Sequence, residues 1–242
     1  MEMLDLEHAR CSLGRGLARQ ALQEAETDCA DATGIVRELH RLAPNPRNRA
    51  RHARRLLRRR GVLRAAATRG GVAVVFRNTL AVTVRKDRSD CYVEPRVAWT
   101  SVCAHAGQHR ISFVTWQVHA SLHAIQRHVE RSACPLHGLL RHMDRTMVEA
   151  LDWLDREDPL RDGDDEYLPI RSGVWAGGLD MLAPDPAWGP AFAGDARPLP
   201  VFSVRTFLSE EEMWPTVWLR WSEATGASRD ATGPLQAAPS AA

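Results

Sequence analysis

Residues 97–131 read VAWTSVCAHAGQHRISFVTWQVHASLHAIQRHVER, a stretch that joins strand-forming sequence to helix-forming sequence. Val97 to Ala104 and Arg110 to Val118 are rich in β-branched and aromatic residues and flank His105–His109, a pattern that favours a β-hairpin. From Leu122 to Arg131 the apolar residues recur at helical spacing. We therefore expect an antiparallel hairpin with a helix packed on it.

The sequence before this stretch is helical first and strand-forming later. Residues 3–42 have helical apolar spacing with a break near 32–34, and a second helix is expected over Arg47–Arg60, which Gly61 ends. Two apolar runs, Val72 to Phe76 and Leu80 to Val84, favour another hairpin that turns at 77–79.

The sequence after this stretch repeats the alternation of helix and strands. The expected elements are a helix over 136–154, strands at Tyr167–Ile170, Val174–Leu182 and Leu199–Leu208, and a short helix containing Trp214, Trp218 and Trp221. Together these elements predict an α+β fold with N-terminal helices, antiparallel hairpins and a central helix packed on the sheet. Its expected parts are a basic helical region at 1–69, an α+β core at 70–226 and a disordered tail at 227–242.

Composition argues against a secreted or membrane-spanning protein. No apolar run in the 242 residues approaches the ~20 residues needed to cross a bilayer. Five cysteines are widely spaced without a Cys-x-x-Cys pair, which is typical of reduced thiols in a cytoplasmic protein.

The basic residues are concentrated in one block. Leu39 to Lys86 contains 13 arginines, one lysine and no acidic residue, whereas acids gather between Asp144 and Glu166. Such a block is typical of a nucleic-acid footprint, and an acidic protein partner, an inhibitor or the chain's own acidic segment explains it equally well. The candidate nucleic-acid-binding residues are Arg51, Arg54, Arg55, Arg58 and Arg59.

The helix predicted around residue 125 separates packing from polar chemistry. On a helix turning ~100° per residue, Val118, Leu122, Ile125 and Val129 form an apolar stripe, and His119, His123, Arg127, Glu130 and Arg131 form a polar one. The simpler interpretation of the polar stripe is a solvated helix face. The functional one is RNA cleavage without a metal, in which histidine exchanges protons and arginine stabilises the charge on phosphorus.

The motif His123-Ala-x-x-Arg127-x-x-Glu130-Arg131, with Val204-Arg-Thr206-Phe downstream, resembles the ribonuclease toxins grouped with RelE, barnase and the colicin ribonucleases. The resemblance spans residues 97–209 at most. It implies an endoribonuclease in which the 2′-hydroxyl of RNA is the nucleophile and no cofactor is needed. It assigns acid–base catalysis to His123, phosphate contacts to Arg127 and Arg131, and a polar contact to Thr206. The long N-terminal region and the helix over 136–154 depart from the compact form of these toxins.

A zinc site is the third functional hypothesis. Seven of the ten histidines lie between His105 and His142, and Cys103, His105 and His109 have a spacing compatible with zinc, as have His119 and His123. No carboxylate ligand lies between Pro95 and Val129, so scattered structural histidines are the simpler interpretation.

Overall fold

A computed structural model of the chain describes residues 2–42, 45–85, 91–107, 111–132, 134–135, 137–183 and 198–226. Helices and strands are both abundant in these residues, and the strands form one curled sheet. The predicted α+β class is therefore confirmed. The tail predicted at 227–242 lies outside the described residues.

The helices lie before, between and after the strands along the chain. Their bounds are α1 Glu2–Thr27, α2 Ala32–His40, α3 Pro46–Leu57, α4 Leu122–Arg131, α5 Leu139–Leu154 and α7 Pro215–Thr225, and a 3-10 turn lies at Glu210–Glu212. The break predicted near 32–34 lies slightly earlier, between α1 and α2, because Asp31 caps α2. Its carboxylate accepts a hydrogen bond from the Gly34 N–H at 2.8 Å, and such a cap stabilises a helix start.

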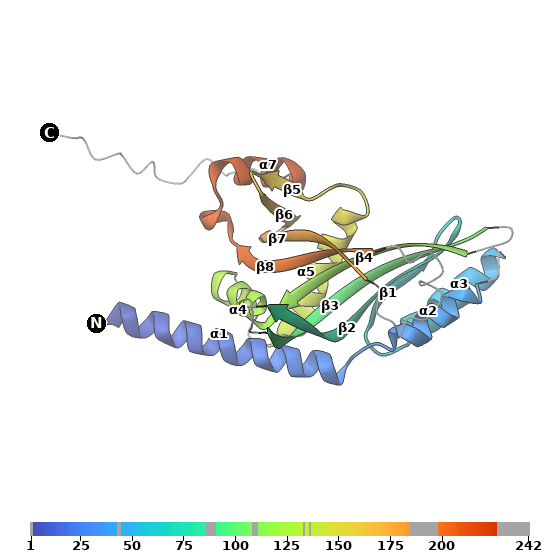
Figure 1. Cartoon of the computed structure of the whole chain (residues 1–242), viewed down its shortest axis with the longest axis horizontal. Coiled ribbons are helices and arrows are strands. Elements are labelled where there is room, and N and C mark those ends of the chain that lie inside the picture. Colours follow the sequence, from blue (N-terminus) through green and yellow to red (C-terminus); the bar gives the residue numbers. More distant parts are fainter. Residues whose placement is uncertain are drawn as a thin grey trace.

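Eight strands of the described residues form the sheet in the order β1-β2-β3-β4-β8-β7-β6-β5. Their bounds are β1 Val62–Ala67, β2 Gly71–Arg85, β3 Cys91–Ala106, β4 Ile111–Ser121, β5 Leu160–Asp162, β6 Asp165–Ile170, β7 Gly173–Leu182 and β8 Leu199–Leu208. Neighbouring strands are antiparallel except β4 and β8, which are parallel. Two four-stranded meanders therefore meet at β4 and β8, as Figure 1 shows.

One face of the sheet is covered by α1, α4 and α5. The cluster on this face joins Trp99, Val118 and Phe202 from the sheet to Met143 and Met147 from α5, and all five side chains are fully buried. Because this cluster contains residues of both meanders, the apolar burial that stabilises one half also holds the other half in place.

The opposite face is covered by α2 and α3 at the end of the molecule labelled with these helices in Figure 1. Val74 and Phe76 of β2 pack there with Leu39 and Leu56, whereas the intervening Val75 packs in the first cluster. This alternation follows from the two-residue period of a strand. A third, smaller cluster joins α7 to β6 and β7.

Two predictions in the N-terminal half are wrong. Residues 77–79 form no turn, because β2 runs through them from Gly71 to Arg85 and pairs with β3 along its whole length. Residues 62–67, in the region predicted to be helical, form β1, which pairs with β2 through a turn at 68–70. The turn was predicted because residues 77–79 are polar. Arg77 and Asn78 are instead buried within the strand, and the charge of Arg77 is compensated by ion pairs with Asp28 and Asp144.

The central prediction is confirmed. β3 and β4 form the predicted hairpin, α4 has the predicted bounds Leu122–Arg131, and the strand at Leu199–Leu208 is β8. The predicted pairing of Tyr167–Ile170 with Val174–Leu182 is also present, between β6 and β7.

Candidate nucleic-acid interface

The local sequence of α3 explains both its start and its orientation. Pro46 occupies the first turn, where its missing N–H costs nothing, and the Asn45 side chain accepts a hydrogen bond from Arg47 N at 2.9 Å. Ala53 and Leu56 are buried against the sheet. Because these two residues fix the inner face, the arginines on the other sides of the helix point outward.

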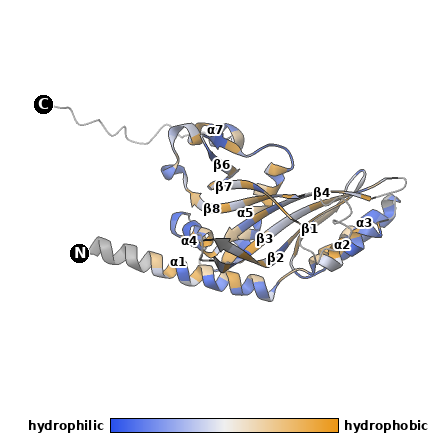
Figure 2. Cartoon of the chain, in the orientation of Figure 1, coloured by the Kyte–Doolittle hydropathy of each residue, from blue (hydrophilic) through white to orange (hydrophobic). Residues whose placement is uncertain are grey.

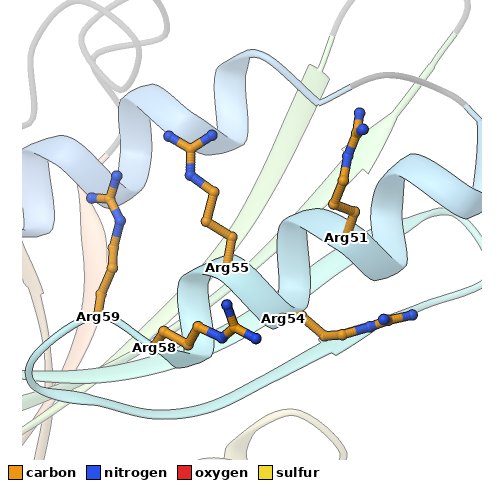
Figure 3. Close-up of a pocket in the computed structure, with 5 residues that line it drawn as sticks. All are labelled: Arg51, Arg54, Arg55, Arg58 and Arg59. Carbon is orange, nitrogen blue, oxygen red and sulfur yellow. The ribbon is translucent and has the colours of Figure 1, made fainter.

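Five arginines of α3 and of the turn that follows it line one groove of about 480 Å³, formed by Arg51, Arg54, Arg55, Arg58 and Arg59. Figure 3 shows two rows: Arg51, Arg55 and Arg59 extend to one side, and Arg54 and Arg58 to another. The rows follow from the spacing of four residues, which brings side chains onto the same face of a helix. All the candidate nucleic-acid-binding residues of the sequence analysis are therefore gathered in one place, on a ribbon coloured mostly hydrophilic in Figure 2.

A buried carboxylate from α2 forms ion pairs with two arginines of one row. Glu38 is 5% exposed, and its oxygens lie 3.2 Å from Arg55 Nε and 2.7 Å from Arg59 Nη2. His52 Nδ1 lies 3.6 Å away. Glu38 is not among the site residues predicted from the sequence. An acidic residue among the apolar positions of a short helix is nevertheless a signal, because a buried charge needs partners.

A second pocket adjoins the groove between α2 and α3. It has a volume of about 230 Å³ and is lined by Gly34, Arg37, Glu38, Arg41, His52, Arg55 and Arg59. Arg55 and Arg59 belong to both cavities, so the groove and the pocket share one wall.

The acidic segment 144–166 neutralises a different part of the basic block. Arg77 Nη1 pairs with Asp144, and Arg64 Nη1 donates to Asp152 Oδ2 at 2.7 Å. Both arginines lie on strands, in β2 and β1. None of the ion pairs found in the described residues joins the five groove arginines to this segment, and Lys86 lies outside those residues.

The predicted ribonuclease residues lie along α4 and β8. His123 is exposed near the start of the helix, whereas the Arg127 guanidinium pairs with Glu130 at 3.0 Å. Arg131 Nε lies 3.0 Å from Glu212, and its Nη1 donates to Phe207 O at 2.9 Å and to Thr206 Oγ1 at 3.5 Å. The structure thus brings Arg131 and Thr206 together.

A bulge in β8 positions Thr206. Val204 pairs with Gly177 and Thr206 with Ala176, so Arg205 is an extra residue without an opposite partner. A bulge of this kind shifts the strand's alternation by one residue. Phe207 therefore points into the same core cluster as Val204 and Phe202.

The predicted polar stripe is wrong at His119. Val118 and His119 belong to β4, because the helix begins only at Leu122, with Ser121 as its cap. His119 is 3% exposed, and burial, followed by the charge of Arg96, lowers its pKa to about 4. His128, which the sequence analysis left out of the stripe, is fully buried on the inner face of α4.

The spacing argument for zinc at His119 and His123 fails with the same helix boundary. His119 is inside the protein and His123 is exposed on α4, so the two are not successive ligands on a helix. His109 lies outside the described residues. Among the residues that the structure describes, no group of three or more His, Cys, Asp or Glu side chains is placed to hold a metal ion.

Comparisons with family models, with curated proteins and with solved structures found no match for this chain. Within the described residues, no helix combines the length and apolar character that crossing a membrane requires. The site must therefore be interpreted from its own geometry and charge.

Proposed function

We propose that this protein binds nucleic acid through the phosphate backbone, using the arginine groove of α3. The observation that supports the proposal is the gathering of five arginines in one groove of about 480 Å³, with Glu38 as the buried carboxylate beneath two of them, Arg55 and Arg59. Guanidinium groups match phosphate oxygens in shape and charge. Because the segment Arg47–Arg60 contains no Phe, Tyr or Trp, binding is expected to depend little on base sequence.

The groove has the reach of a short strand of nucleic acid. From Arg51 to Leu57 the helix rises ~9 Å, and Arg58 and Arg59 lie just beyond its end. This length corresponds to roughly three nucleotide steps at ~3.4 Å along a stacked strand. Arg54 and Arg58 form the row that Glu38 does not contact. These two side chains therefore carry the charge most available to a phosphate.

The test is the salt dependence of binding to a fluorescent single-stranded RNA, measured by anisotropy. The double variant Arg54→Gln/Arg58→Gln should bind more weakly, and the slope of log K against log salt should become shallower by about 1.4, because two phosphate contacts are lost. Arg171→Gln/Arg220→Gln is the matched control, since both arginines are exposed far along the chain from α3. Equal affinities and slopes for the groove variant and wild type would refute the proposal.

A second candidate is the metal-independent ribonuclease, which the contact between Arg131 and Thr206 favours. If it is correct, RNA should be cut in the presence of chelator to leave a 2′,3′-cyclic or 3′-phosphate, and DNA should stay intact. His123→Ala should slow cleavage roughly a hundredfold, the effect expected when a general acid or base is removed. His137→Ala is the control because His137 is also exposed. No cleavage by well-folded protein, or equal rates for the two variants, would exclude this candidate.

A further inference from the structure

The pocket between α2 and α3 differs from the groove beside it. It is smaller, about 230 Å³ against about 480 Å³, and two helices form its walls. Arg37 and Arg41 come from the α2 side, and Arg55 and Arg59 from the α3 side. Four guanidinium groups therefore surround one small space, against the single carboxylate of Glu38.

Glu38 forms ion pairs with two of these guanidinium groups before any ligand arrives. It contacts Arg55 Nε and Arg59 Nη2, which leaves the other guanidinium nitrogens of both side chains unused by this pair. An arginine that is already ordered loses less conformational entropy on binding. The carboxylate thus positions two donors and neutralises only part of the positive charge.

Gly34 makes room for this arrangement. A Cβ at Gly34 would lie 2.9 Å from Arg59 Nη1 and would overlap the Asp31 carboxylate that caps α2. The Gly34 N–H is also the donor to that cap. The absence of a side chain at this position therefore allows the Arg59 guanidinium to lie against the first turn of α2, at the edge of the pocket.

We propose that this pocket binds the terminal phosphate of a nucleic-acid strand whose backbone lies in the adjoining arginine groove. A phosphate monoester carries about −1.5 to −2 charges at pH 7, whereas each internal phosphodiester carries one. A space enclosed by four arginines stabilises the more highly charged group more. The shared wall of Arg55 and Arg59 places the terminal group next to the strand. This inference rests on the proposed nucleic-acid-binding function.

The experiment compares oligonucleotides of one sequence that carry a 5′-phosphate, a 3′-phosphate or hydroxyls at both ends, by competition anisotropy at fixed ionic strength. One phosphorylated form should bind at least about tenfold more tightly than the hydroxyl form, a difference of ~1.4 kcal/mol. In Arg41→Gln and in Arg37→Gln this ratio should fall towards one, with the hydroxyl form bound nearly as in wild type. Both arginines are exposed, and circular dichroism checks that the variants are folded.

The groove variant supplies the complementary result. Arg54→Gln/Arg58→Gln should weaken all three oligonucleotides by a similar factor and leave the ratio unchanged, because neither residue lines the pocket. Equal affinity for the three oligonucleotides would overturn the terminal-phosphate site while leaving the proposed function intact. Absence of binding to every oligonucleotide would overturn the proposed function itself, and the terminal-phosphate site with it.

Discussion

Arg77 shows how a buried charge can be part of the fold of this protein. It is 1% exposed on β2, its Nη1 pairs with Asp144 and its Nη2 lies 2.7 Å from Asp28 Oδ2. Trp99 Nε1 donates to the second oxygen of Asp144 at 2.9 Å. The network connects β2 and β3 to α5 and to the end of α1. Arg77, which in the sequence indicated a turn, therefore joins four elements of the fold.

Removing Arg77 should be strongly destabilising. Arg77→Ala leaves the carboxylate of Asp144, which is 14% exposed, without its main partner, and breaking a pair of this kind costs ~3–5 kcal/mol. Arg60→Ala is the matched control, because Arg60 also pairs with Asp28 but is 62% exposed, and an exposed pair contributes under ~1 kcal/mol. Urea denaturation measures both free energies of unfolding. Similar losses for the two variants would contradict the assigned role.

Two buried histidines should make the protein less stable in acid. Burial, reinforced by the nearby His142, lowers the pKa of His128 to about 3, and burial lowers that of His119 to about 4. The unfolded chain therefore takes up these protons first, at a pKa near 6.5. Stability should be fully present above pH ~6.5 and should fall below it, by up to ~1.4 kcal/mol per pH unit for each histidine.

Urea denaturation between pH 7 and pH 4 measures this dependence. In His128→Gln the fall in the free energy of unfolding over this range should be smaller than in wild type, since one titrating group is lost. Exposed His137→Gln should leave the slope unchanged. A slope that is the same in all three proteins would show that His128 does not contribute to the acid sensitivity.

At the scale of elements, α4 is placed by its two ends. Ser121, the last residue of β4, caps the helix, and its Oγ accepts a hydrogen bond from Ala124 N at 3.2 Å. At the other end, Arg131 donates a hydrogen bond to the Phe207 carbonyl of β8 and forms an ion pair with Glu212. The change from strand to helix therefore occurs within one residue, at the position that the helical spacing predicted.

Ser121→Ala should destabilise the protein by ~1 kcal/mol, the usual effect of removing an N-cap side chain. Ser121→Asp should restore most of the loss, because aspartate is an equally good cap at a helix start. Thermal or urea denaturation measures both. A loss of stability that aspartate does not recover would mean that Ser121 acts through packing in β4, where it is 8% exposed.

At the scale of the whole molecule, the junction of the two meanders determines whether the two halves of the sheet unfold together. β4 and β8 pair over only four positions, from Gln117 opposite Val201 to Ala120 opposite Val204. The apolar cluster of α1, α4 and α5 spans this junction and contains Trp99 of one meander and Trp175 of the other. We therefore expect the halves to unfold together.

Phe202→Ala should test this coupling, because the fully buried Phe202 lies on β8 within the shared cluster. A buried Phe→Ala change costs ~3–5 kcal/mol, and the fluorescence and far-ultraviolet circular dichroism transitions should shift together. Met181→Ala on the neighbouring β7, where Met181 is 59% exposed, should change stability little. Separate transitions in Phe202→Ala would show that the meanders are independent units.

The sequence by itself determined the α+β class, the β3–β4 hairpin, the bounds of α4 and the arginine row of α3. Each of these depends on local periodicity or on charge along one helix, which the order of residues contains directly. It also placed five arginines that the structure gathers in one groove.

Only the tertiary structure decided which charges are neutralised. Arg64 and Arg77 find their carboxylates 88 and 67 residues away, whereas Glu38 lies beneath Arg55 and Arg59. The parallel contact of β4 with β8 and the burial of His119 and His128 likewise depend on segments far apart in the chain. Ion pairs and burial are properties of distances in space, so a pattern of neighbouring residues cannot fix them.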